Sequence, residues 1–269
     1  IMQDFTGKTV VITGAGSGMG RAYAKAFAAL GCKVALCDVD REALAETQRL
    51  IRADHCLFMH VDVADANEVL EFSQRVEAEL GPAHIVINNA GIEGSAQPSW
   101  KTSLDTYRRV MEVNYFGVVH GTRAFLAQLQ SHDESWLVNV SSIFGLIGTP
   151  NHTDYCGSKF AVRGYTEALM CELKGSPVNV LLAHPGGIAT NIARHDFNQR
   201  FAQHYLTTSP EAFVEALIAA IRKKRHRLVF GAGSRKSALA ARLLPLGILS
   251  SVIWREMKNI IDTRHYPNK

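Results

Sequence analysis

A tyrosine, a lysine and a serine of this chain have the types and the spacing that proton transfer at a bound oxygen atom requires. Tyr155 and Lys159 lie four residues apart, and Ser142 lies thirteen residues before the tyrosine. Four residues make about one helical turn, so the phenol and the ammonium project from the same helix face. A phenol titrates at ~10 in water, and a fixed cation beside it favours the phenolate and lowers its pKa. We therefore expect Tyr155 to transfer a proton, Lys159 to tune it, and Ser142 to orient a carbonyl oxygen.

The same spacing also has a purely structural explanation. Tyrosine and lysine are common on helices, so Tyr155 could be a half-buried ring beside a solvated Lys159. Spacing alone favours this explanation, and the catalytic interpretation depends on the motifs elsewhere in the chain.

A glycine-rich turn near the N-terminus separates a predicted strand from a predicted helix. Residues 9–13 have the pattern of a short buried strand, glycines recur over residues 14–20, and residues 21–30 have a helical pattern that ends at Gly31. Glycines let the backbone approach a pyrophosphate, and a helix N-terminus offers free N–H groups and a positive dipole end. The alternative is a flexible connector, which would need no ordered glycine spacing. The residues predicted to surround the phosphates are Gly14, Ser17, Gly18, Met19 and Gly20.

An acidic residue ends the second predicted strand. Residues 33–37 are mostly apolar and are followed by Asp38, whose carboxylate could accept hydrogen bonds from an adenosine ribose and would repel a 2′-phosphate. Positions 17 and 39 hold Ser17 and Val39, so neither supplies a base for that phosphate. The pattern predicts NAD as the cofactor, with NADP left open by Arg41. The alternative role for Asp38 is to cap the next helix.

Together, these motifs resemble the short-chain dehydrogenase/reductase family, in its short single-domain branch. The resemblance extends from about Thr6 to Gly231 and covers six motifs in the family's order and spacing. It implies that Lys159 stabilises the phenolate and binds the nicotinamide ribose, and that Asn114 holds a water in the proton relay. The catalytic residues implied are Asn114, Ser142, Tyr155 and Lys159.

The resemblance also implies further cofactor contacts. The pair at 62–63 would contact the adenine, residues 88–91 would line the cofactor cleft, and residues 185–190 would hold the nicotinamide carboxamide. The cofactor residues implied here are Asp62, Val63, Asn89, Ala90, Gly91, Pro185, Gly186, Ile188 and Thr190, together with Tyr155 and Lys159.

The predicted activity is hydride transfer between NAD and a secondary alcohol or ketone. Three alternatives stay open: an NADP-preferring carbonyl reductase of the same fold, a non-catalytic dinucleotide sensor, and a sugar-nucleotide epimerase or dehydratase. A sensor would not need the four catalytic residues, and an epimerase usually carries a larger C-terminal substrate domain. The predicted pocket wall, at 92–99, 143–152 and 188–205, favours an apolar substrate. Its apolar members are Ile143, Phe144, Leu146, Ile147, Ile192, Phe197 and Phe201.

Strand and helix patterns alternate along the chain. This predicts a doubly wound Rossmann-type α/β fold, with a seven-stranded parallel sheet flanked by helices. Strands are expected near 8–13, 33–38, 56–61, 84–88, 136–140, 178–184 and 227–230, and two long helices near 104–130 and 153–174. We expect a single catalytic domain over 1–233, with 234–269 as its C-terminal extension. A hydrophobic content of 47% is enough for a sizeable core.

The composition indicates in which cellular compartment the protein is expected and whether it is expected to bind a metal. Five cysteines without a Cys-x-x-Cys motif argue against a disulfide framework and for a reducing, cytoplasmic location. No signal peptide is expected, because the first strand begins within about eight residues of the first residue given. Eleven histidines form no cluster with metal-ligand spacing, so no metal is expected.

The C-terminal part is basic and apolar. Residues 222–269 carry 12 Lys/Arg and 2 Asp/Glu, a net charge of +10, which leaves −6 on the rest. The stretch 237–254 is mostly apolar, and the favoured interpretation is an extension packed on the core, on a subunit partner or at the pocket mouth. The alternative is a weak peripheral contact with anionic lipid. Nucleic-acid binding is not expected, and the resemblance implies a homo-oligomer formed through the two long helices.

Overall fold

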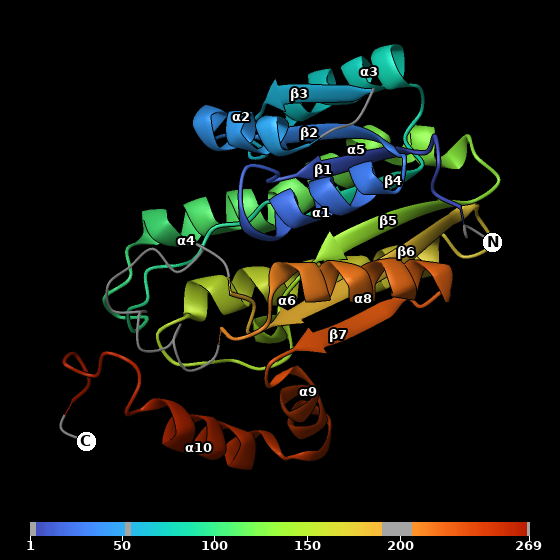
Figure 1. Ribbon diagram of the computed structural model, residues 1–269. Coiled ribbons are helices and arrows are strands. Elements are labelled where there is room, and N and C mark those ends of the chain that lie inside the picture. Colours follow the sequence, from blue (N-terminus) through green and yellow to red (C-terminus); the bar gives the residue numbers. More distant parts are fainter. Residues whose placement is uncertain (1–3, 52–54, 190–205, 268–269) are drawn as a thin grey trace.

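The computed structural model describes residues 4–51, 55–189 and 206–267, and its centre is one parallel sheet (Figure 1). The strand order is β3-β2-β1-β4-β5-β6-β7, and every pairing is parallel. The predicted doubly wound Rossmann-type fold with seven parallel strands is confirmed. The strands are β1 (Thr9–Thr13), β2 (Lys33–Asp38), β3 (Cys56–His60), β4 (Ile85–Asn88), β5 (Ser135–Val140), β6 (Val178–Gly186) and β7 (Arg227–Gly231).

Both faces of the sheet are buried, which explains why its strands are continuous apolar runs. In β1, Val10 and Ile12 belong to one hydrophobic cluster, whereas Val11 belongs to the other. The first cluster lies under α1, α2 and α8, and the second under α3, α5 and α6. These helices are α1 (Gly18–Ala29), α2 (Arg41–Leu50), α3 (Ala66–Leu80), α5 (Gly117–Gln130), α6 (Thr153–Glu172) and α8 (Pro210–Arg222).

The strand order reverses direction between β1 and β4. From β1 the chain proceeds outward to β2 and β3, and then returns to add β4 on the other side of β1. In such sheets the carboxyl ends of the two central strands leave a crevice where ligands bind. The glycine turn after β1 and residues 89–91 after β4 lie at this crevice.

The long helix predicted over 104–130 contains an irregular turn. It consists of α4 (Leu104–Met111), the π-helical turn η1 (Glu112–Phe116) and α5. A π turn inside an α-helix is frequently found at a functional site. Here it carries Asn114, which is fully buried.

Two helices follow β7 and form a hairpin below it in Figure 1. They are α9 (Ser234–Leu243) and α10 (Leu246–Met257), and Pro245 is the N-cap residue of the second. One face of α10 is buried through Leu249, Ile253 and Met257, which pack with Ile147. None of the helices in the described ranges has the length and apolar character needed to cross a membrane.

Candidate active site

The glycine turn after β1 is shaped by close backbone contacts. A Cβ on Gly14 would lie 2.7 Å from Ala90 Cα, and one on Gly20 would lie 1.9 Å from the Gly14 carbonyl oxygen. Gly14 also has φ of +66°, which favours glycine. Ser17 precedes α1 without a side-chain capping bond, so the first N–H groups of the helix lack side-chain partners there. The turn therefore has the shape and polarity of a phosphate cradle.

Asp38 is positioned at this turn, not at the next helix. Its Oδ2 accepts a hydrogen bond from the Gly16 N–H at 2.8 Å, and its Oδ1 accepts one from Asp40 at 2.9 Å. The alternative role as a helix cap is wrong, because Asp40 caps α2 through the N–H groups of Glu42 and Ala43. The carboxylate that the sequence singled out thus lies within reach of the glycine turn.

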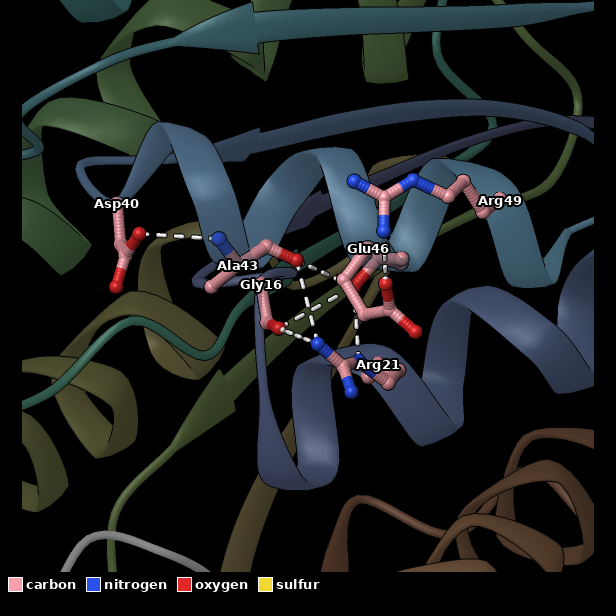
Figure 2. A network of polar contacts seen from close by, with 7 residues as sticks. Gly16, Arg21, Asp40, Ala43, Glu46 and Arg49 are labelled. Carbon is pink, nitrogen blue, oxygen red and sulfur yellow. Dashed lines mark hydrogen bonds and ion pairs between the residues drawn. The ribbon is translucent and has the colours of Figure 1, made fainter.

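An arginine of α1 connects the same turn to α2 (Figure 2). Arg21 Nη2 donates to the Gly16 carbonyl at 2.6 Å and to Ala43 O at 3.3 Å, and its Nε donates to Thr47 Oγ1 at 3.0 Å. Thr47 Oγ1 in turn donates to Ala15 O at 2.9 Å. This guanidinium is engaged with the backbone, which makes it a support for the turn and not a ready partner for a 2′-phosphate. Sequence reasoning missed both residues.

The segment after β4 closes the opposite side of the turn. Thr13 Oγ1 accepts the N–H groups of Asn89 at 3.0 Å and Ala90 at 3.1 Å, and Asn89 Nδ2 donates to Thr13 O at 3.0 Å. The position of Gly91 is tight, since a Cβ there would lie 3.3 Å from Asn114 Oδ1 and 3.5 Å from Lys159 Nζ. The glycine turn and the proposed catalytic residues therefore border one cleft.

The other implied cofactor residues lie in different surroundings. Val63 is buried against the position of Gly117 in α5, and Asp62 pairs with Arg109 at 3.2 Å, both following the end of β3. Gly186 lies under the start of α9, where a Cβ would be 2.6 Å from Ser234 Cβ. This contact within the chain accounts for the glycine at position 186, whether or not a ligand binds there. Pro185 and Ile188 do line the pocket described below, and Thr190 lies outside the described residues.

Tyr155, Lys159 and Ser142 meet at the wall of one pocket. Ser142 follows β5 and accepts the Phe144 N–H at 3.1 Å through its Oγ. Lys159 Nζ donates to Val140 O at 3.1 Å and lies 5.6 Å from the centre of the Tyr155 ring. The predicted helical turn between the tyrosine and the lysine is present in α6.

Burial sets the pKa of both α6 groups. It raises the pKa of Tyr155 to about 12, and the interaction with the Ser142 hydroxyl lowers it only in part. Burial likewise lowers the pKa of Lys159 to about 8. The expected lowering of the Tyr155 pKa was wrong, because desolvation outweighs the stabilisation of the phenolate.

Asn114 holds the cleft together through its side-chain amide. Its Nδ2 donates to Ile92 O at 2.9 Å and to Ser158 Oγ at 3.0 Å, while its Oδ1 accepts the Ile92 N–H at 2.8 Å. These bonds fix the segment after β4 against α6, beside Lys159. The assignment of a relay water to Asn114 stays a prediction.

Two buried residues that sequence reasoning left without a role support the site. His184 in β6 donates from Nδ1 to the Ser142 carbonyl at 2.8 Å, and burial lowers its pKa to about 4, which keeps the ring neutral. Asp154 accepts the Tyr155 N–H through Oδ1 and the Ser95 N–H through Oδ2, each at 2.8 Å. The only sequence signal for Asp154 was an acid in the first turn of a helix.

The pocket has a volume of about 210 Å³ and a mostly apolar lining. Two of the predicted wall segments contribute, through Glu93 and Gly94 and through five residues of 143–152, and Ile188 represents the third. Leu146 is buried without lining it, and Ile192, Phe197 and Phe201 lie outside the described residues. The apolar residues of the lining are Met19, Val140, Ile143, Phe144, Ile147, Pro185, Ile188, Leu206, Ala232, Ile253 and Met257.

A metal site does not emerge from the described part of the chain, where no three His, Cys, Asp or Glu side chains group as ligands.

Comparison with known proteins places this geometry in a family. A family model described as short chain dehydrogenase matches residues 8–200. A putative oxidoreductase SadH of Mycobacterium tuberculosis is 38% identical over 261 residues, covering 90% of this chain and 93% of that protein. Dehydrogenase/reductase SDR family member 7B of Rattus norvegicus is 35% identical, covering 68% of this chain and 59% of its own length.

A solved structure agrees with the fold. The short chain dehydrogenase/reductase from Burkholderia phymatum, crystallised in complex with NAD, superposes with a TM-score of 0.81 at 30% sequence identity. The match covers 90% of this chain and 94% of that one. Sequence motifs, strand order and relatives agree, and the chain belongs to the short-chain dehydrogenase/reductase family of oxidoreductases.

Proposed function

We propose that the protein is an NAD-dependent dehydrogenase that interconverts a secondary alcohol and a ketone of apolar character. The observation that carries this proposal is the meeting of Ser142, Tyr155 and Lys159 at the wall of a mostly apolar pocket, beside the glycine turn. The nicotinamide ring, when bound, would accept or return the hydride. The protein supplies the positions of the reactants and the path of the proton.

The cradle after β1 fits a dinucleotide. The glycines at 14 and 20 let the turn pack tightly against Ala90 and against itself, and the start of α1 would hold the phosphates through Ser17, Gly18 and Met19. Asp38 at the turn would accept hydrogen bonds from the adenosine ribose. Arg21 donates to the Gly16 and Ala43 carbonyls, which makes its guanidinium less available to a 2′-phosphate and supports NAD over NADP. Asp62, Val63, Ala90, Gly186 and Thr190 remain cofactor residues by resemblance alone.

The pKa shifts of Tyr155 and Lys159 bear on how the proton is transferred. Tyr155 is the base in the oxidative direction, taking the proton of the alcohol, and the acid in the reductive direction. Its raised pKa disfavours the phenolate, so Lys159 must stabilise that form once the cofactor and the substrate change its surroundings. Ser142 would hold the substrate oxygen, with His184 fixing the Ser142 backbone.

The surrounding chain is proposed to act as a single catalytic unit. One sheet spans residues 9–231, and residues 234–269 would be an extension that closes the pocket, since Ile253 and Met257 line it. We propose a homo-oligomer through the segment α4–η1–α5 and through α6, where Leu104 of α4, Phe116 of η1 and Phe160 of α6 are exposed. The five free cysteines agree with a reducing, cytoplasmic location.

The test is a screen of purified protein with NAD⁺ or NADP⁺ against steroids, retinoids, aliphatic alcohols and polyols, followed by the absorbance of the reduced cofactor. We expect NADH production with apolar secondary alcohols and little with polyols. A protein that binds NADH and oxidises none of these alcohols would instead be a dinucleotide sensor. Higher turnover with NADP⁺ than with NAD⁺ at equal concentrations would overturn the cofactor assignment.

A further inference from the structure

The turn between α9 and α10 exposes a group of large apolar side chains. Leu239 is 58% exposed, Leu243 65%, Leu246 79% and Ile248 54%. Among residues 4–51, 55–189 and 206–267, eleven large hydrophobic residues are exposed, and four of them fall within ten residues. We call these four residues the apolar tip. Single exposed leucines are normal on a protein surface, but a local group of them marks an interaction site.

The hairpin that carries the apolar tip has two distinct apolar regions. Leu249, Ile253 and Met257 recur every four residues along α10 and are buried toward Ile147. The side chains of the apolar tip have no such cover in the described part of the chain. The buried face accounts for the attachment of the hairpin to the pocket, and packing among the described residues does not account for the apolar tip.

Basic side chains surround the apolar tip. Residues 234–258 carry five Lys/Arg and a single acid, Glu256, which pairs with Lys236 at 3.1 Å. Arg235, Arg242, Arg255 and Lys258 are exposed. The separate basic run at 222–227 does not add to this surface, because it lies at the other end of β7.

We propose that the apolar tip docks onto an anionic lipid surface, with its leucines among the acyl chains and the basic side chains at the headgroups. This is the arrangement of an interfacial helix, which binds through apolar burial together with attraction to anionic lipid. A second copy of the chain is the less suitable occupant, since two such tips would bring two positively charged surfaces together. The helices of the hairpin are too short to span a bilayer, so the contact lies in the plane of the interface.

Docking would bring the substrate pocket close to the membrane. Ile253 and Met257 of α10 line the pocket from the same hairpin that carries the apolar tip. An apolar alcohol or ketone dissolved in the lipid could then reach the pocket without crossing bulk water. This consequence rests on the proposed function, whereas the docking itself does not.

The test is flotation of the full chain, without substrate or cofactor, with vesicles of phosphatidylcholine alone or mixed with phosphatidylglycerol. We expect flotation with the mixed vesicles that weakens in high salt. Leu243→Ser combined with Leu246→Ser should reduce partitioning roughly tenfold or more. Arg242→Gln combined with Arg255→Gln should reduce it by roughly fivefold for each charge removed.

Matched control variants separate the apolar tip from general surface effects. Leu50→Ser with Leu70→Ser removes two exposed leucines from α2 and α3, and Lys223→Gln with Arg225→Gln removes two charges from the run beyond α8. Both controls should float like the wild type, and circular dichroism should show that every variant is folded.

Three results would overturn the proposal. The first is no flotation of the wild type with the mixed vesicles at low salt. The second is unchanged flotation of the folded variant of Leu243 and Leu246. The third is a combined result in which neither the wild type nor the variant of Leu243 and Leu246 floats, and the wild type forms an assembly in vesicle-free sedimentation that this variant does not form. That result would assign the apolar tip to contact with a second copy of the chain. Because none of these readouts uses turnover, failure here leaves the proposed dehydrogenase activity untouched.

Discussion

Backbone atoms form the wall of the cleft at the glycine turn, whereas side chains from distant segments form the wall of the substrate pocket. At the turn, a single added Cβ on Gly14 or Gly20 would collide with main-chain atoms. In the pocket, Phe144, Ile253 and Met257 come from η2 (Ile143–Gly145) and α10, more than a hundred residues apart. The glycine turn should therefore tolerate almost no added side-chain atom. The pocket wall should tolerate the exchange of one apolar side chain for another.

The largest effect is expected where the two regions meet. Tyr155→Phe keeps the ring but removes the group that carries the proton, so kcat should fall by at least roughly a hundredfold. NADH binding, measured by fluorescence titration, should stay close to that of the wild type. Turnover above about a tenth of the wild-type rate would remove Tyr155 from the catalytic role.

The pH dependence should follow the raised pKa of Tyr155. A raised pKa means that the phenolate fraction grows as pH rises, so oxidation should speed up by up to roughly tenfold per pH unit between about pH 7 and about pH 8. The rise should flatten as Lys159, with its pKa lowered to about 8, loses its charge. Steady-state rates in overlapping buffers check this.

Lys159→Arg is the control for that profile, because arginine keeps its charge throughout this range. The variant should lose rate, yet its profile should continue to rise above about pH 8. An oxidative rate in the wild type that stays flat over the whole range would contradict the assignment of Tyr155 as the base.

The tolerance of the glycine turn is tested by Gly20→Ala. The added methyl group would meet the Gly14 carbonyl, so the turn must shift, and NADH affinity should fall by roughly tenfold or more with a loss of ~1–3 kcal/mol in stability. Thermal unfolding and NADH titration measure the two effects.

Gly164→Ala in α6 is the matched control. Apart from its chain neighbours and the backbone of its own helix, no atom of the described residues lies within 4 Å of its would-be Cβ, so this change should raise stability by about 0.5–1 kcal/mol and leave NADH affinity unaltered. If Gly20→Ala and Gly164→Ala changed stability and NADH affinity equally, the close backbone contacts of the glycine turn would not explain its sensitivity to substitution.

Cofactor choice should depend on a single carboxylate. Asp38→Ala combined with Val39→Arg removes the repulsion of a 2′-phosphate and supplies a base beside it. The ratio of kcat/KM for NADP⁺ over NAD⁺ should rise by roughly tenfold or more. Asp40→Ala is a useful comparison, since it removes the α2 cap and should lower stability without changing the ratio.

The smallest effect is expected in the pocket wall. Met257→Leu keeps the apolar lining and should change KM for an apolar alcohol by only a few fold, whereas Met257→Ala should raise it more. Both variants should bind NADH normally, because Met257 is not part of the glycine turn. Weakened NADH binding in Met257→Leu would mean that the two regions are coupled.

Short-range patterns were sufficient to predict much of the fold. The strand β1, the glycine turn and α1 are adjacent in the chain, and the helical repeat alone places Tyr155 beside Lys159. Even the end of β2 was predicted at Asp38, because an apolar run stops at a charged residue. The end of β6 was harder to predict from the sequence. Its last residues pair with β7 up to Gly231, and that partner strand lies far along the chain.

The sequence by itself therefore determined the element order and the residues of the glycine turn and of α6, since these depend on neighbours along the chain. Only the tertiary structure decided how burial shifts the pKa of Tyr155, and that Asp38 bonds to the glycine turn while Asp40 caps α2. The same holds for His184 beneath Ser142 and for α10 at the pocket. Desolvation and contact between distant segments depend on which surfaces meet in space, and spacing along the chain does not encode this.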